Sequence, residues 1–333
     1  MVYLNNGNTP QAISTYKELI TNAPTSEEAR QASENLKSLM ADQNRIDEYA
    51  RFIEQVPNAQ QMKPSELDNL PYDSAVRDYL NTGKTGRIVD YLAKFPNGIY
   101  RPEALSYLIE AATTSGDRQS AIKYSTELIE NYPDNTLVPD ALKALGDTYL
   151  ALGKHGEALN TFTKLELMAD PYMTNDARIG IIRSADALKQ YSIVINMADA
   201  LTASSTVAPD QRSEARYMKG VALDATGKAD DAATIWTDLS KDITDEYGTR
   251  AAFSLAEQQF RAGNLQKAHK LAEEFIGSDT PFDYWYARGV ILFSDINRAE
   301  GKDYEADFYL KNLKENYPGS ETDIYEMIES RSR

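Results

Sequence analysis

Residues 140–171 read DALKALGDTYLALGKHGEALNTFTKLELMADP, and this stretch decides the fold. Apolar and small residues first recur at steps of three and four, which is the spacing of one helix face, at Leu142, Leu145, Gly146 and Tyr149. Gly153 interrupts the pattern, the same steps resume at Ala158, Phe162 and Leu165, and Pro171 supplies a stop. The stretch therefore predicts a helical hairpin, in which Gly146 and Ala158 are small where the two helices approach closely.

The same register returns along most of the chain. Equivalent positions are occupied by Ile88, Ala121, Ala158, Val194, Ala232, Ala268 and Ala306, at spacings of 33, 37, 36, 38, 36 and 38 residues. Turn glycines accompany them at Gly83, Gly116, Gly153, Gly227, Gly263 and Gly301, whereas the Val194 unit has Lys189 or Gln190 at that place. Periods of this length indicate a solenoid of stacked hairpins. We expect the hairpin with Lys189 to be less regular.

Small, large, turn and stop residues at these separations resemble a tetratricopeptide repeat. The resemblance implies an all-α fold without a sheet, a right-handed αα-superhelix of about nine hairpins in which each hairpin buries its apolar stripe against its neighbours. We divide this single solenoid, residues 1–333, into a partial first repeat (1–25), a hairpin (26–57), an irregular repeat with an insertion (58–98), six regular repeats (99–319) and a terminal capping helix (320–333). Because residues 1–25 match only the second half of a hairpin, we expect further repeats to precede them in the full-length protein.

A narrower resemblance concerns the C-terminal part. Residues 284–319, YWYARGVILFSDINRAEGKDYEADFYLKNLKENYPG, are similar to the last repeat of long tetratricopeptide proteins of the Bacteroidetes cell envelope. Residues 121–133, AIKYSTELIENYP, resemble more distantly the periplasmic repeat proteins of outer-membrane assembly. These resemblances imply a scaffold in the periplasm or cell envelope, and they imply no particular ligand.

Composition excludes several classes of function. The formal net charge is −16 and the isoelectric point is about 4.7, which argues against nucleic acid and against anionic membranes as partners. The sequence has no cysteine, so it forms no disulfide and no thiolate site. It has no apolar run of the roughly 18 residues that a membrane span needs, so we expect no direct insertion into a membrane.

Each catalytic signal has a simpler structural interpretation. The Gly-Lys pairs at Gly153, Gly227 and Gly301 lack the second glycine and the Ser/Thr of a phosphate-binding loop, and we interpret them as repeat turns. His155 and His269 are the only histidines and lie in different repeats, so we expect no metal site. We therefore predict a protein that is not an enzyme and needs no cofactor.

Function is expected on the surface of the first helices of the hairpins. Positions that flank each packing stripe give a candidate groove of Glu103, Tyr107, Glu110, Lys143, Asp147, Arg183, Tyr217, Arg250, Phe253, Arg261, Arg288 and Arg298. The flanking positions in the middle of the groove are mostly acidic, because they also include Asp140, Asp176, Asp186, Glu214 and Asp224. The C-terminal third has four arginines, which we expect to converge on one surface. Acids one helical turn away can pair with two of them, Glu257 with Arg261 and Asp295 with Arg298.

Two functions remain open at this point. The first is a scaffold that binds segments of unidentified protein partners in the groove, with a solvated face that binds nothing as its simplest alternative. The second is a module that binds glycans or small ligands, because sugars stack on exposed aromatic rings, for which Tyr217, Phe253, Trp285 and Tyr286 are the candidates. Several exposed coplanar rings would favour the glycan, and an unbroken charged groove would favour the peptide.

Overall fold

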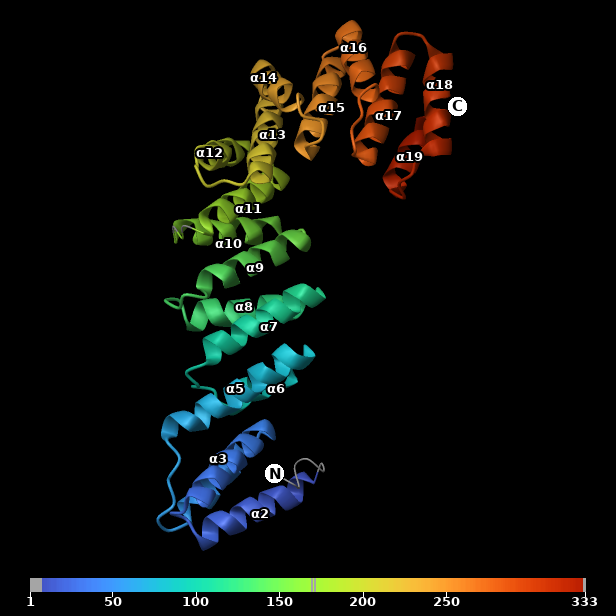
Figure 1. Ribbon diagram of the computed structural model, residues 1–333. Coiled ribbons are helices and arrows are strands. Elements are labelled where there is room, and N and C mark those ends of the chain that lie inside the picture. The colour runs from blue at the N-terminus through green and yellow to red at the C-terminus, as the bar shows by residue number, and fades with distance from the viewer. Residues whose placement is uncertain (1–7, 169, 171, 332–333) are drawn as a thin grey trace. The chain divides into compact units, whose positions relative to one another are not determined.

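The structure of the chain is a computed structural model that describes residues 8–168, 170 and 172–331. Over these residues it has eighteen helices and no strand, which confirms the all-α prediction for this part of the chain (Figure 1). The chain divides into two compact units, an N-terminal unit of residues 1–148 and a C-terminal unit of residues 149–333. The boundary falls inside helix α9, which spans Val138–Ala151.

The helices of the N-terminal unit follow one another with short connections. They are α2 (Thr9–Asn22), α3 (Glu27–Asp42), α4 (Ile46–Glu54), α5 (Pro64–Thr82), α6 (Gly86–Lys94), α7 (Arg101–Ser115) and α8 (Arg118–Asn131), followed by the first part of α9. The second hairpin begins with a side-chain cap, since the Ser26 hydroxyl accepts a hydrogen bond from the backbone N–H of Ala29 at 3.0 Å. In the repeat that we expected to be irregular, α5 is a continuous helix of 19 residues that contains Pro71. The extended part of the insertion is therefore confined to the residues between α4 and α5.

The C-terminal unit repeats the helix–turn–helix arrangement to the end of the described chain. Its helices are α10 (His155–Leu167), α11 (Thr174–Ala187), α12 (Tyr191–Thr202), α13 (Pro209–Ala225), α14 (Ala229–Leu239), α15 (Glu246–Arg261), α16 (Leu265–Ile276), α17 (Asp283–Ala299), α18 (Asp303–Asn316) and α19 (Thr322–Arg331). Each helix packs on the next one in sequence, and α11, α13, α15, α17 and α19 also contact one another in that order. The first helices of the hairpins thus form a continuous face within this unit, which we call the first-helix face.

The turns inside the hairpins share one backbone geometry. Each predicted turn glycine has a positive φ, between 68° and 83°, a conformation that costs glycine little because it has no Cβ atom. Two hairpins have another residue in the same conformation, Asn44 with φ 58° and Lys189 with φ 57°. After Lys189 the backbone N–H of Gln190 donates to the carbonyl of Ala185 at 2.8 Å, a bond that recurs in the glycine turns and closes the end of the first helix. The hairpin without glycine therefore has the ordinary turn, with a lysine in the left-handed position.

The cores lie between successive hairpins. One cluster joins Tyr217, Trp236 and Leu255, which come from α13, α14 and α15, and another joins Phe253, Phe275 and Phe293 from α15, α16 and α17. Glycines let the helices approach closely: a Cβ atom on Gly220 would lie 2.3 Å from the Trp236 indole nitrogen. Gly220 and Trp236 are sixteen residues apart, as are Gly146 and Phe162 in the stretch that decided the fold. Gly146 itself is buried in α9.

Candidate binding surface on the first helices

The candidate residues of the N-terminal unit form an acidic, tyrosine-rich surface. Glu103, Tyr107 and Glu110 lie on successive turns of α7, and the Tyr107 ring meets the edge of Tyr79 on α5 with centroids 5.6 Å apart. One carboxylate oxygen of Glu103 is buried and has no hydrogen-bond partner among the described residues. Burial raises the pKa of the Tyr72 hydroxyl, and the negative groups around it, Glu103 included, raise this pKa further. The electrostatic potential of this surface is therefore more favourable for a positively charged group than for a negatively charged one.

Lys143 and Asp147 lie one turn apart on α9 and form an ion pair of 2.8 Å. The lysine ammonium is therefore neutralised within its own helix, in the manner typical of residues four apart. Neither charge is a free contact for a ligand.

In the C-terminal unit, Arg183 connects two first helices. Its guanidinium donates two hydrogen bonds from α11 to the Glu214 carboxylate on α13, at 2.6 and 2.7 Å. The Glu214 side chain is buried, so the carboxylate of this bidentate ion pair is shielded from solvent. Burial raises the pKa of the nearby Tyr247 hydroxyl, and the Glu214 carboxylate raises it further. Arg183 and Glu214 thus fix the relation of α11 to α13.

Two arginines come together around one indole ring on α15 and α17. The Arg250 guanidinium lies 5.0 Å from the centroid of Trp285 and 5.0 Å from that of Tyr247. The Arg288 guanidinium lies 5.6 Å from Trp285 and 5.1 Å from Phe253. We call Arg250, Trp285 and Arg288 the arginine–tryptophan cluster. All three side chains are partly exposed, so the cluster presents two stacked cations and an apolar ring to a ligand.

The two arginines of the cluster differ in their partners. Arg250 donates to the Glu246 carboxylate one turn earlier on α15, at 2.6 Å. Arg288 donates only to the Tyr284 hydroxyl, at 3.4 Å, and no carboxylate of the described residues lies within ion-pair distance of it. The Tyr284 hydroxyl in turn donates to Asp323 on α19, at 2.8 Å. Arg288 is therefore held in place by rings and a hydroxyl without being neutralised.

The other two arginines lie elsewhere, which corrects the expectation that all four converge. Arg261 and Arg250 are eleven residues apart on α15, about 16 Å along the helix axis. Arg261 pairs with Asp224 of α13 at 2.7 Å, and Arg298 pairs with Asp307 of α18. The predicted pairs of Glu257 with Arg261 and of Asp295 with Arg298 were wrong, since Asp295 accepts two hydrogen bonds from Arg331 on α19. For Arg261, Arg298 and Asp295, the partner lies on a neighbouring helix and not one turn away on the same helix.

Two aromatic candidates are part of the core, which corrects their placement on an open groove. Tyr217 and Phe253 are 9% and 5% exposed and belong to the clusters between hairpins. Large rings at these positions fill the space between first helices, so little of either ring can contact a ligand. Sequence reasoning missed Tyr247 and Tyr284 as parts of the surface. The signal was present, because each lies three or four residues before an arginine on the same helix.

Neither a metal centre nor a membrane span appears in the part of the chain that the structure describes. No three His, Asp or Glu side chains of these residues are placed to hold a metal ion. No described helix combines the length and the apolar character that crossing a bilayer requires.

Comparisons with known proteins agree with this architecture. Residues 1–26 match the family model described as tetratricopeptide repeat. No curated protein matches the sequence.

A tetratricopeptide repeat protein from Parabacteroides merdae superposes with a TM-score of 0.52 at 14% identity, over 78% of this chain and 98% of that one. The Cut9–Hcn1 hetero-tetramer of APC/C gives a TM-score of 0.44 at 14% identity, over 99% of this chain and 67% of that one. BtubC (BKLC) from P. vanneervenii gives 0.46 at 10% identity, over 64% and 95%. The repeated hairpins with their left-handed turns and the likeness to the Parabacteroides structure show that this chain has the fold of tetratricopeptide repeat proteins, and the family model matches its first 26 residues.

Proposed function

We propose that this chain is a non-enzymatic scaffold that binds an extended segment of a partner protein along the first-helix face of its C-terminal unit. The observation that carries the proposal is the arginine–tryptophan cluster, in which the Arg288 guanidinium lacks a carboxylate partner among the described residues. This cation is present in a chain with a formal net charge of −16. Local positive charge on an acidic protein favours an acidic ligand at that place.

The geometry of the cluster suits side-chain carboxylates. A guanidinium can donate two parallel hydrogen bonds to one carboxylate, and the indole of Trp285 offers an apolar surface to the neighbouring part of the segment. Both arginines are already ordered by contact with rings, so they lose less side-chain freedom on binding than free arginines would. We therefore infer a segment in which acidic and apolar residues alternate.

A glycan is the weaker candidate on this face. The rings around Trp285 are not coplanar, since Phe253 is tilted by 56° and Tyr284 by 87° relative to it. The Trp285 ring also has a guanidinium within stacking distance from each of two helices. A sugar would have to displace one of these cations before it could stack on the indole.

The proposed compartment is the periplasm or the cell envelope. It rests on the resemblance of residues 284–319 to cell-envelope repeat proteins. Fractionation of cells that express the full-length protein, followed by immunodetection, would place it, and recovery only from the cytosolic fraction would contradict this part of the proposal.

The binding proposal is tested with a defined pair of fluorescent peptides. One peptide alternates glutamate and leucine, and the other has glutamine in place of each glutamate. We expect measurable binding of the acidic peptide, weaker binding at high salt, and at least tenfold weaker binding by the double variant Arg250→Glu, Arg288→Glu. Arg216→Glu is the matched control, because Arg216 pairs with Asp238 of α14 and does not belong to the cluster.

We expect circular dichroism of each variant to show that the helical content is retained. Equal binding of the acidic and the glutamine peptide, or acidic-peptide binding that survives both the double substitution and high salt, would remove the cluster from consideration. The wild-type and double-variant proteins can then serve as paired baits in envelope extract, where a genuine partner is captured by the first alone.

A further inference from the structure

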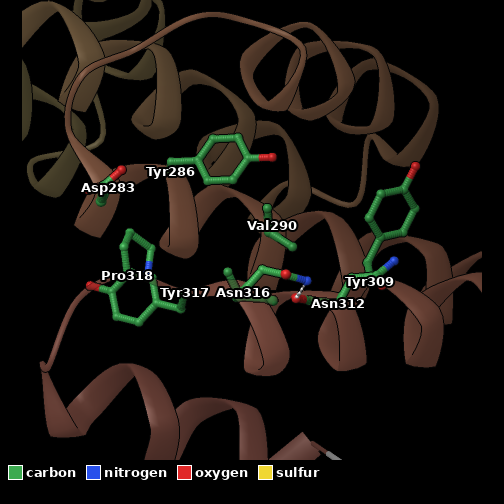
Figure 2. Close-up of a pocket in the computed structure, with 9 residues that line it drawn as sticks. Asp283, Tyr286, Val290, Tyr309, Asn312, Asn316, Tyr317 and Pro318 are labelled. Carbon is green, nitrogen blue, oxygen red and sulfur yellow. Dashed lines mark hydrogen bonds between the residues drawn. The ribbon is translucent and has the colours of Figure 1, made fainter.

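A pocket of about 300 Å³ opens between α17 and α18, apart from the arginine–tryptophan cluster. Figure 2 shows Asp283, Tyr286 and Val290 on α17 opposite Asn312 and Asn316, which lie on α18. This volume is at the lower end of the range for small-molecule sites and is large enough for one long side chain. The pocket is therefore a candidate site for a single chemical group rather than for a whole peptide.

The floor of the pocket is apolar. Val290 and Leu313 are buried there in the core cluster that α17, α18 and α19 share, and Pro318 closes one end. An aliphatic stem could lie on this floor and remove apolar surface from water.

Three polar groups around the floor lack partners within the described chain, whereas the Tyr317 hydroxyl donates to Glu321 at 2.6 Å. The Asp283 carboxylate and the hydroxyls of Tyr286 and Tyr309 form no hydrogen bond or ion pair with any described residue. Asn316 donates to the backbone carbonyl of Asn312 at 2.9 Å, which leaves its amide oxygen available as an acceptor. Hydrogen-bond acceptors thus remain available around the pocket, beside the aromatic rings of Tyr286 and Tyr309.

The pocket is negative in charge. None of the residues that line it is Lys, Arg or His. Burial raises the pKa of the Tyr317 hydroxyl at its edge, and the carboxylates of Glu321, Asp283 and Asp323 raise this pKa further. A cation would relieve this concentration of negative charge, and an anion would increase it.

We propose that this pocket binds the cationic head of an arginine or lysine side chain presented by a partner protein. The head group pairs with Asp283, lies against the rings of Tyr286 and Tyr309 and donates to the asparagine amide oxygens, while the methylene stem covers Val290 and Leu313. The carboxylate and the aromatic rings suit the charged head of such a side chain, and the apolar floor suits its methylene stem. The site is independent of the arginine–tryptophan cluster, which has the opposite charge.

The test uses short peptides that differ in one group. The acetylated, amidated tripeptide Gly-Arg-Gly is titrated into the protein by calorimetry, in parallel with the same peptide carrying citrulline, which has the shape of arginine without its charge. We expect the arginine peptide to bind at least tenfold more tightly than the citrulline peptide. The variants Asp283→Asn and Tyr286→Leu should each weaken binding about tenfold, and Asp279→Asn, an exposed acid outside the pocket, should not change it.

Further measurements distinguish a peptide side chain from a free small-molecule cation as the ligand. They also distinguish the pocket from the arginine–tryptophan cluster as the binding surface. Tyr286 is exposed, so its substitution tests the pocket even if Asp283→Asn alters the start of α17. Binding of the arginine peptide should be unchanged in the double variant Arg250→Glu, Arg288→Glu. Equal affinity for arginine and citrulline peptides, full affinity in both pocket variants, or binding of free agmatine without binding of the peptide would overturn the proposal.

Discussion

Lys189 occupies a backbone conformation that the other regular repeats give to glycine. Its φ of 57° places it in the left-handed region, where the Cβ atom of an L-residue crowds the following carbonyl. We expect Lys189→Gly to stabilise the protein by about 0.5–1 kcal/mol, because the relief of this crowding exceeds the entropy that glycine loses on folding. Thermal and urea unfolding of the two proteins would measure the difference.

The converse substitution is the matched control. Gly227 has φ 83° at the equivalent place in the next hairpin, and we expect Gly227→Lys to destabilise the protein by a similar amount. If both substitutions shift stability in the same direction, the crowding argument fails.

For single residues, the sequence predicted the position of each turn but not the backbone conformation of every residue in the turn. The glycines were visible as interruptions at a constant distance from the packing alanines, and their conformation follows from the requirement for a positive φ. The left-handed conformation of Lys189 could not be predicted from the residue type. The hydrogen bonds of the closed turn impose this conformation on whichever residue occupies the position. Tyr217 and Phe253 were assigned to a groove for a similar reason, because spacing alone does not show how far a large ring reaches between helices.

Single elements are held to their neighbours by close contacts at small residues. A Cβ atom on Gly220 would lie 2.3 Å from the buried Trp236 ring, and the indole nitrogen also donates to the Tyr217 carbonyl at 3.4 Å. The ring cannot move without losing that bond, so we expect Gly220→Ala to cost about 1–3 kcal/mol by overpacking. Urea denaturation of the variant would measure this cost.

Gly156→Ala provides the comparison, because a Cβ atom there would meet no atom within 4 Å. In that helix alanine should be neutral or stabilising by up to about 1 kcal/mol. A second comparison is Gly146→Leu, for which the same overpacking cost of about 1–3 kcal/mol is predicted from the shared spacing. Unchanged stability of Gly220→Ala would show that the contact with Trp236 is looser than described.

An ion pair joins α3 to α5 across the insertion of the N-terminal unit. Lys37 donates to Glu66 at 2.8 Å, and the Glu66 carboxylate also accepts from the backbone N–H of Lys63. Burial alone would raise the pKa of Glu66, but these hydrogen bonds hold the pKa below its ordinary value of 4.5. The resulting stabilisation is present above pH 4.5 and is lost as the pH falls through the lower pKa of the folded state.

We therefore expect Glu66→Gln to destabilise the protein by about 1 kcal/mol at pH 7 and by progressively less as the pH falls below 4.5. Glu34→Gln is the control, because Glu34 shares the same lysine but is more exposed, and its effect should be smaller. Melting temperatures at a series of pH values would check this. A difference between wild type and Glu66→Gln that does not change with pH would contradict the assignment.

The pairing of charges between elements was the least predictable part of the candidate site. The prediction searched only for partners three or four residues apart on one helix. Arg183, Arg261 and Arg331 each pair instead with an acid on another helix. These partners are 31, 37 and 36 residues away, which is about one repeat. The period of the sequence contains part of this information once the first helices are known to contact one another. A search at the repeat spacing of 36–38 residues would have found the pairs of Arg261 and Arg331, whereas Arg183 and Glu214 are only 31 residues apart.

Across the whole molecule, stability is distributed over separate clusters instead of one core. Ile53 is buried in a cluster built from α2, α3 and α4, and Ile296 is buried in one built from α15, α16 and α17. In repeat proteins each unit depends on its own stability and on contacts with its neighbours, so a local loss need not spread along the chain. Binding surfaces at different places can then be altered one at a time.

This arrangement leads to a prediction about the response to a distant cavity. Ile53→Ala should cost about 2–5 kcal/mol locally, because it leaves a hole in a fully buried site. We expect native-state hydrogen exchange to show reduced protection of the amides in α2–α4 and unchanged protection in α15–α18. Ile296→Ala should give the reverse pattern. Equal loss of protection along the entire chain in either variant would mean that the repeats unfold as one cooperative body, and the arginine–tryptophan cluster could then be disturbed by substitutions far from it.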